Sequence, residues 1–170
     1  GLESYFQSMK YAEKADYEEG RGKVFVTIAD TYSQSENSQN AVIYYGKSIE
    51  ILRNGKDYLG LAMAIFNAGD EYLNMKKLDS ALLYTKEAQV IFEKVNYPIG
   101  DAYCFGNLGM IYAENGDKIV AEENINKAVR ILEVYKEYEP ILVSLAFMSS
   151  IFLHNGDQPN ALEYAERNLN

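Results

Sequence analysis

The chain has 170 residues, the length of one ordinary domain, and its apolar fraction of 48% is sufficient to build a core. Its net charge of −9 argues against a nucleic-acid backbone or an anionic membrane surface as the main partner. The single cysteine, Cys104, excludes an intramolecular disulfide and a cysteine-built zinc site. There is no signal-peptide pattern and no apolar run of membrane-spanning length, so we expect a cytoplasmic protein.

A period of 40 residues runs through the sequence, and a period of this size indicates stacked structural repeats. Several residue types recur at this spacing. The clearest series are four alanines, Ala41, Ala81, Ala121 and Ala161, and four aromatics, Tyr32, Tyr72, Tyr112 and Phe152. A small residue lies three positions before each aromatic: Ala29, Gly69, Gly109 and Ser149.

Each 40-residue unit is predicted to form two helices. In the first helix of one unit, Phe105, Leu108 and Tyr112 recur at helical spacing, and in its second helix Ala121, Ile125 and Ala128 do the same. Polar and glycine-containing segments are predicted to form the turns between the two helices: 33–40, 115–117 and 155–157. Gly20, Gly60, Gly100 and Pro140 are predicted to mark the reverse turn between units. The small residues are expected where paired helices approach closely.

This pattern of a large apolar residue, glycine or alanine, tyrosine and two later alanines resembles the tetratricopeptide repeat. The period exceeds the family's common 34 residues, which predicts longer helices. In this respect the sequence resembles the long repeats of kinesin light chain, of LGN-type scaffolds and of bacterial Rap-type receptors. The resemblance implies an all-α fold, a right-handed superhelix of stacked antiparallel helix pairs. It places the second helix of a preceding repeat at 1–19, repeats at 20–59, 60–99 and 100–139, and a repeat with a shortened second helix at 140–170.

The same frame predicts that the sequence is a piece of a longer protein. Leu2, Phe6 and Met9 resemble an interior repeat rather than a polar end cap, and Asn170 falls inside a second helix. Uncapped ends would also permit stacking on a second copy, so a homo-oligomer is one possible state.

Residues for catalysis are scarce. His154 is the only histidine, which excludes a Ser-His-Asp triad and a multi-histidine metal site, and no phosphate-binding glycine loop is present. Cys104 occupies a small-residue position and is interpreted as a helix-contact residue. We expect no enzymatic activity, metal or cofactor in this segment.

In the tetratricopeptide family the first helices line a concave groove, and the resemblance implies which positions face it. In this sequence they are Lys23, Thr27, Asp30, Met63, Phe66, Asn67, Asp70, Tyr103, Asn107, Met110, Phe147 and Ser150. Asn67 and Asn107 occupy the register at which related repeats clamp a peptide. An asparagine can bind a backbone amide with both its donor and its acceptor. The alternative is that these asparagines bond neighbouring helices or water.

The composition of these positions indicates what the groove would bind. Basic side chains are too few for a carboxylate clamp, whereas the apolar side chains suit an extended or helical peptide with apolar anchors, and Asp30 and Asp70 suit a basic residue in that peptide. The alternative for the aromatics is packing within the solenoid. His154 is read as either a groove contact or a solvated helix-end residue.

The sequence thus favours a protein–protein interaction module that binds a peptide in its concave groove, as a scaffold or sensory arm. The alternative is the regulatory or dimerising region of a bacterial signalling enzyme, such as a nucleotide cyclase or histidine kinase, or of a DNA-binding regulator. Neither hypothesis assigns nucleic-acid or membrane binding to this segment.

Overall fold

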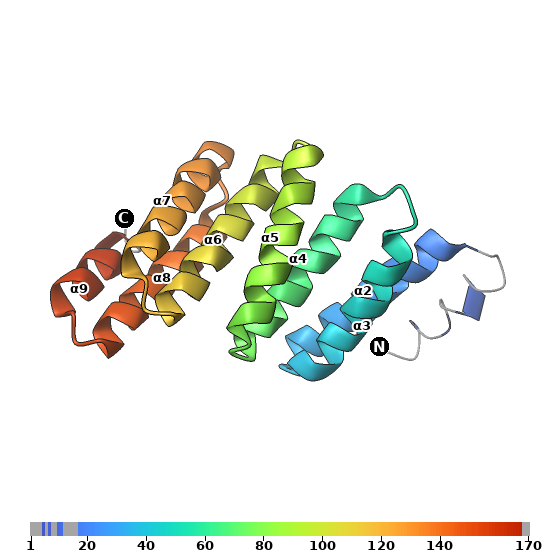
Figure 1. The fold of residues 1–170 in the computed structure, drawn as a ribbon, viewed down its shortest axis with the longest axis horizontal. Helices are drawn as coiled ribbons and strands as arrows, with labels where there is room; N and C mark the ends of the chain where they lie inside the picture. The colour runs from blue at the N-terminus through green and yellow to red at the C-terminus, as the bar shows by residue number, and fades with distance from the viewer. Residues whose placement is uncertain (1–4, 6, 8–9, 12–16, 168–170) are drawn as a thin grey trace. The chain divides into compact units, whose positions relative to one another are not determined.

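The structure is a computed structural model, and it describes residue 5, residue 7, residues 10–11 and residues 17–167. The predicted helix over residues 1–19 and the residues Leu2, Phe6 and Met9 therefore lie largely or wholly outside the described residues. Every element of regular secondary structure that it describes is helical (Figure 1). The elements are α2 (Glu18–Gln34), α3 (Ser38–Leu52), α4 (Tyr58–Asn74), α5 (Leu78–Lys94), α6 (Pro98–Glu114), α7 (Lys118–Tyr135), α8 (Tyr138–His154) and α9 (Gln158–Arg167).

The chain divides into two compact units, Gly1–Asn96 and Tyr97–Asn170. In the first unit α2 packs on α3, α4 packs on α5, and α4 also contacts α3 and α2. In the second unit α6 packs on α7, α8 packs on α9, and α8 also contacts α6 and α7. The expected all-α fold of antiparallel helix pairs is confirmed for the described residues.

The turns inside each helix pair follow one design. Three residues separate the two helices of each pair, and the middle one is in the left-handed conformation: Glu36, Lys76, Gly116 and Gly156, with φ between 57° and 83°. The predicted left-handed role of the two glycines is confirmed. In the first and third pairs a polar side chain then caps the second helix: Asn37 accepts a hydrogen bond from the Asn40 N–H at 3.2 Å, and Asp117 accepts one from the Val120 N–H at 3.3 Å.

The positions predicted to mark the reverse turns between repeats lie inside helices instead. Helices α2, α4, α6 and α8 begin at residues 18, 58, 98 and 138, so Gly20, Gly60, Gly100 and Pro140 lie inside a first turn rather than in a reverse turn. Residues 18 and 19 accordingly belong to α2. The physical reason is visible at Gly60, whose N–H donates to Asp57 Oδ1 at 2.8 Å. A Cβ at Gly60 would lie 2.7 Å from Asp57 Oδ2, so glycine lets the capping carboxylate fold over the helix end.

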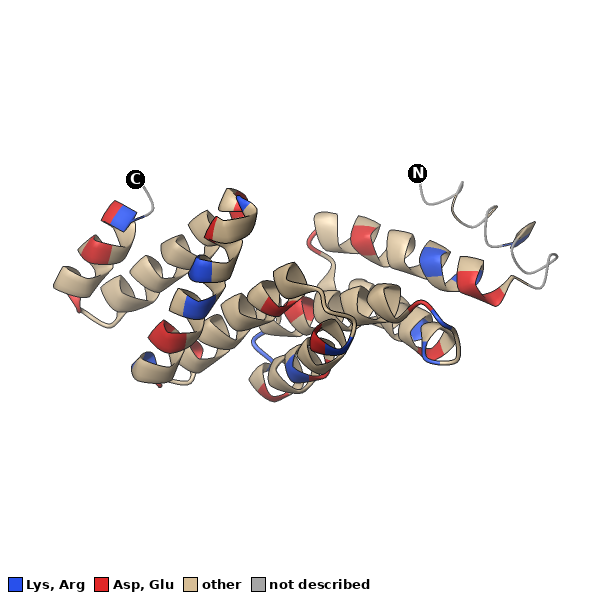
Figure 2. Ribbon diagram, turned by 90° about the horizontal axis from the view of Figure 1, so that it is seen from above, with Lys and Arg blue, Asp and Glu red and all other residues tan. Residues whose placement is uncertain are grey.

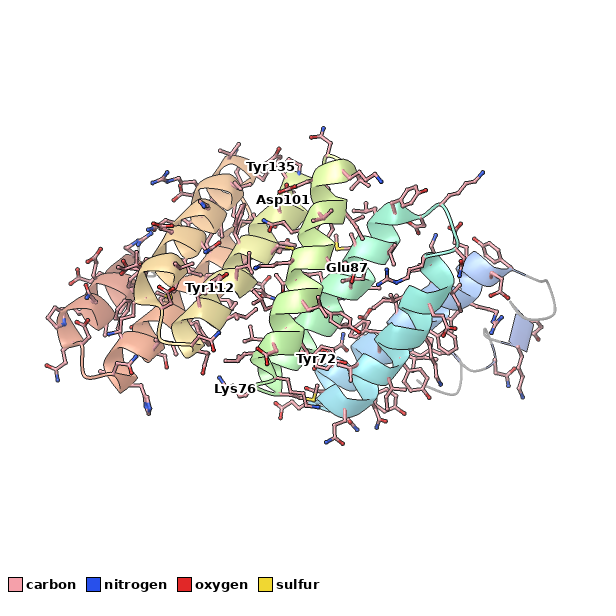
Figure 3. All side chains as sticks on the ribbon, viewed as in Figure 1. Tyr72, Lys76, Glu87, Asp101, Tyr112 and Tyr135 are labelled. Carbon is pink, nitrogen blue, oxygen red and sulfur yellow. The ribbon has the colours of Figure 1, made fainter. Side chains whose placement is uncertain are left out.

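The small and aromatic series build the contacts between paired helices. Ala41, Ala81, Ala121 and Ala161 are all buried. A Cβ added to Gly69 would meet Thr85 Oγ1 at 3.2 Å, so this glycine does mark a close approach of α4 to α5. The ring of Tyr72 on α4 lies 5.1 Å from that of Tyr84 on α5, and Figure 3 shows Tyr72 beside this pair of helices.

Candidate functional site in the first unit

A polar pocket of about 220 Å³ opens among helices α2, α3 and α4. Its lining residues are Asp30, Ser33 and Gln34 from α2, Tyr45 from α3, and Asn67, Asp70 and Glu71 from α4. Three of the predicted groove residues, Asp30, Asn67 and Asp70, therefore meet in one place. They meet because α2 and α4 contact each other, and because residues 67 and 70, three positions apart, lie on one face of α4.

A hydrogen-bond network ties the three helices together at this pocket. The Tyr45 hydroxyl donates to Asp30 Oδ1 at 2.6 Å, and the side chain of Asn67 hydrogen-bonds the same hydroxyl. Burial raises the pKa of the Tyr45 hydroxyl well above its usual range, and the bonded Asp30 carboxylate raises that pKa further. Tyr45 is 2% exposed, so its ring is fixed in the core while its hydroxyl reaches the pocket.

The pocket is acidic. Asp30, Asp70 and Glu71 contribute three carboxyl groups, and no lysine or arginine is among its lining residues. Glu71 is the most buried of the three, at 3% exposed. Within the part of the chain that the structure describes, no group of three or more His, Cys, Asp or Glu side chains is arranged to hold a metal ion. The acidic lining suits an organic cation, such as a guanidinium or ammonium group, that can donate hydrogen bonds to several of these oxygen atoms.

The other predicted residues of the first unit lie along α2 and α4 outside this lining. Lys23 is exposed, and its ammonium pairs with Glu19 at 2.8 Å and with Asp57 at 3.3 Å. The hydrogen bond with Glu19 raises the pKa of Lys23 above its usual range, and the hydrogen bond with Asp57 raises it further. Thr27 is half-buried and donates its hydroxyl to the Lys23 carbonyl at 3.1 Å. Met63 and Phe66 are half-buried on α4, and the Phe66 ring lies 6.5 Å from that of Phe92.

The predicted residues of the second unit lie on α6 and α8. Asn107 is 4% exposed, so it is buried within its unit and is not a surface side chain there. Tyr103 and Phe147 are half-buried and pack against the apolar core of this unit, as the packing interpretation of the aromatics predicted. Met110 is half-buried, and Ser150 and His154 are exposed. Burial raises the pKa of the Tyr103 hydroxyl, and the negative charge of Glu137 raises it further.

Sequence reasoning missed four lining residues of the pocket: Ser33, Gln34, Tyr45 and Glu71. One signal was available for Glu71, because the positions 40 and 80 residues later are Ile111 and Ile151. Ile111 is fully buried, so a carboxylate at the same register is an exception that indicates a special environment.

A larger hollow of about 590 Å³ lies elsewhere in the first unit, beside the start of α2 and the end of α3. Acidic residues (Glu18, Glu19, Glu50) and basic residues (Arg21, Lys47) line it together. These opposite charges select no ligand class, and none of the predicted groove residues is part of its lining. Acidic residues are otherwise distributed over both units (Figure 2).

Comparison with known proteins identifies the 40-residue repeat. The sequence matches the tetratricopeptide repeat family over residues 22–53 and over residues 102–131. These two segments of the chain are tetratricopeptide repeats. The two matched segments lie in different units, one over α2 and α3 and the other over α6 and α7.

Among relatives, this chain is 26% identical over 171 residues to response regulator aspartate phosphatase E of Bacillus subtilis (strain 168). That alignment covers 94% of the chain and 45% of the phosphatase, so the chain spans less than half the length of this curated relative.

Solved structures show the same fold. The apo form of RapI superimposes with a TM-score of 0.84 at 15% identity, over 98% of this chain and 61% of that one. Repeats of a putative kinesin light chain from Podosopora anserina superimpose with a TM-score of 0.71 at 17% identity, over 98% of this chain and 82% of that one. The expected resemblance to Rap-type and kinesin light chain repeats is confirmed, whereas the resemblance to LGN-type scaffolds stays a prediction. None of the helices described in this chain combines the length and apolar character needed to cross a bilayer.

Proposed function

We propose that this chain binds a partner protein through a peptide segment, and that the acidic pocket of the first unit receives a cationic group of that segment. The observation that carries the proposal is the meeting of Asp30, Asn67 and Asp70 in one polar pocket, with a third carboxylate from Glu71.

Each part of the pocket has a separate task in this proposal. The carboxylates attract and hydrogen-bond the cation, in a concavity where water screens charges less than it does on an open surface. The Asn67 amide binds the peptide backbone next to the cationic residue. Met63 and Phe66, half-buried on α4, offer the apolar surface on which a neighbouring side chain of the peptide packs.

We further propose that the described part of the chain acts by binding and not by catalysis. Cys104 is fully buried, and His154 is exposed at the last residue of α8. Neither residue contributes to the pocket, whose lining holds carboxylates, amides and hydroxyls without histidine or cysteine. Histidine, the most frequent general base, and the cysteine thiol are thus absent from the site proposed here.

The relative's name favours a second candidate, a role in bacterial signalling. A protein named as a phosphatase of response regulators aligns with 94% of this chain, but the chain spans only 45% of it. On this proposal the chain is the binding or regulatory part of a longer signalling protein, which was the alternative hypothesis from the sequence. A purified response-regulator receiver domain that binds the chain would support this role, and the absence of binding in both its phosphorylated and unphosphorylated forms would refute it.

The pocket can be tested before any partner is known, with the small probe N-acetyl-arginine amide. Addition of the probe to ¹⁵N-labelled protein is expected to shift the backbone resonances of residues 30, 67, 70 and 71 in the NMR spectrum. N-acetyl-citrulline amide, which has nearly the same shape without the charge, is expected to bind at least several-fold more weakly.

Substitution distinguishes the pocket from the general negative charge of the protein. Asp70→Asn is expected to weaken binding of the arginine probe roughly 3- to 10-fold, because one charge-assisted partner is lost. Asp79→Asn removes the same charge from the exposed first turn of α5, outside the pocket lining, and is expected to leave the affinity unchanged. Equal effects of the two variants would show that the probe responds to net charge and not to this pocket.

A further inference from the structure

We propose that Tyr45 is a positioning residue of this pocket, because its hydroxyl reaches from α3 and fixes the side-chain orientations of Asp30 on α2 and Asn67 on α4. This inference rests on the proposed function, which it deepens by naming what orients the binding groups. Tyr45 does not need to touch the ligand to play this part.

The hydrogen bonds determine which atoms face which way. The Tyr45 hydroxyl has one proton, which it donates to Asp30 Oδ1 at 2.6 Å, and its oxygen accepts a hydrogen bond from the Asn67 side chain. Only the NH₂ end of an asparagine amide can donate, so Asn67 directs Nδ2 toward the hydroxyl. We call these two hydrogen bonds the Tyr45 bridge. Asp30 Oδ2 and the Asn67 amide oxygen are then the acceptors that this bridge leaves for a ligand.

The anchor of this bridge is rigid. The Tyr45 ring is 2% exposed on a helix that packs against both α2 and α4, so its hydroxyl cannot move away without opening the core. The surroundings also keep the proton in place, since burial and the Asp30 carboxylate raise the pKa of the hydroxyl. The direction of both hydrogen bonds is therefore maintained at neutral pH.

The bridge is specific to this place in the described repeats. The residues 40, 80 and 120 positions after Tyr45 are Thr85, Ile125 and Ala165. None of these side chains is long enough to carry a hydroxyl between two neighbouring helices as a phenol does. The fold does not require a tyrosine at this register, which favours a role in the pocket over a role in packing alone.

The variant Tyr45→Phe deletes the hydroxyl and keeps the buried ring. In the protein without ligand, it is expected to shift the Asn67 side-chain amide resonances in the ¹⁵N spectrum. It is also expected to weaken binding of N-acetyl-arginine amide roughly 3- to 10-fold, the effect of losing one oriented hydrogen bond. Tyr44→Phe is the matched control, because Tyr44 precedes Tyr45 on α3 and its ring stacks on Tyr32 at 5.4 Å, outside the pocket lining.

A double-mutant cycle separates positioning from general loss of stability. In the Asp30→Ala background, Tyr45→Phe is expected to weaken binding by a smaller factor than it does in wild type, because one of the two side chains that it orients is gone. Unchanged Asn67 resonances in Tyr45→Phe, or full additivity with Asp30→Ala, would overturn the positioning role. If wild type does not bind the probe at all, the proposed function fails, and the positioning role fails with it. If wild type binds and Tyr45→Phe binds equally well, only the positioning role fails.

Discussion

Glu36, Lys76, Gly116 and Gly156 occupy equivalent turns, and all four adopt a left-handed backbone conformation. Two of the four are not glycine, although this conformation costs an L-residue with a Cβ roughly 1–2 kcal/mol. Glu36, with φ of 57°, and Lys76, with φ of 57°, therefore hold strain that the third and fourth repeats avoid with glycine. The first unit is expected to gain stability when this strain is removed.

Glu36→Gly is expected to increase the free energy of unfolding by about 0.5–1 kcal/mol, the relief of the strain less the greater entropy of glycine in the unfolded chain. Urea denaturation followed by circular dichroism measures the change. Glu36→Ala removes the same carboxylate but keeps a Cβ, so it is expected to give no such gain. Equal stabilisation by both variants would attribute the effect to charge instead of conformation.

Tyr164 makes the free energy of unfolding depend on pH in the alkaline range. Its ring is 3% exposed and stacks on Phe152 at 5.5 Å, and burial raises the pKa of its hydroxyl to about 12. The unfolded chain ionises this phenol near its usual value of about 10. Since the folded state holds the proton more tightly, its contribution is complete below about pH 10 and is lost as the pH rises towards 12.

The free energy of unfolding is thus expected to lose roughly 1–2 kcal/mol between pH 9 and pH 11.5 through Tyr164. Tyr164→Phe is expected to remove that part of the pH dependence. Urea denaturation at the two pH values measures it, with Tyr138→Phe, at a tyrosine that is 60% exposed, as the control. A loss of the same size in wild type and in Tyr164→Phe would contradict the assignment.

At the scale of the helices, glycine has opposite meanings at two positions. Gly109 faces the partner helix, and a Cβ there would lie 2.6 Å from Ile125 Cδ1 and 3.1 Å from the Ala121 carbonyl oxygen. Gly46 is exposed in the middle of α3, and a Cβ there would meet nothing within 4 Å. The first glycine allows α6 and α7 to approach, whereas the second only weakens its helix.

Substitution by alanine should therefore change stability in opposite directions. Gly109→Ala is expected to destabilise the protein by about 1–2 kcal/mol, because overpacking of a buried contact outweighs the better helix propensity of alanine. Gly46→Ala is expected to stabilise it by up to about 1 kcal/mol. Thermal and urea denaturation of the two variants provide the comparison, and a stabilising Gly109→Ala would disprove the close helix contact.

The helices and their turns were largely predictable from sequence, because each depends on local spacing. A 40-residue period, alanines that are buried in every repeat, and glycines at residues 116 and 156 are sufficient to place the helix pairs. The reverse turns predicted at Gly60 and its equivalents were wrong because glycine is common in two places. It occurs in turns, and it also occurs in the first turn of a helix, where a capping side chain folds over it. Sequence alone does not distinguish these uses.

At the scale of the molecule, the pocket was predictable only in part. Asp30, Asn67 and Asp70 follow from the resemblance to the tetratricopeptide repeat, which implies the groove-facing positions of each first helix. Tyr45 and Glu71 do not, since the equivalent residues Thr85 and Ile111 are fully buried, and the polar ends of Tyr45 and Glu71 converge only when three helices pack together. Asn107 shares the register of Asn67 but is 4% exposed, which shows that equal registers can have unequal surroundings.

The central claim is that the first unit binds a peptide by a cationic side chain in its acidic pocket. Selection from a phage-displayed library of random heptapeptides tests it most directly, with wild type and the double variant Asp30→Asn/Asp70→Asn as parallel targets. Wild type is predicted to enrich sequences with arginine or lysine at one position, and the double variant is predicted to lose that preference. The same basic preference in both selections, or no enrichment of basic residues by wild type, would contradict the claim.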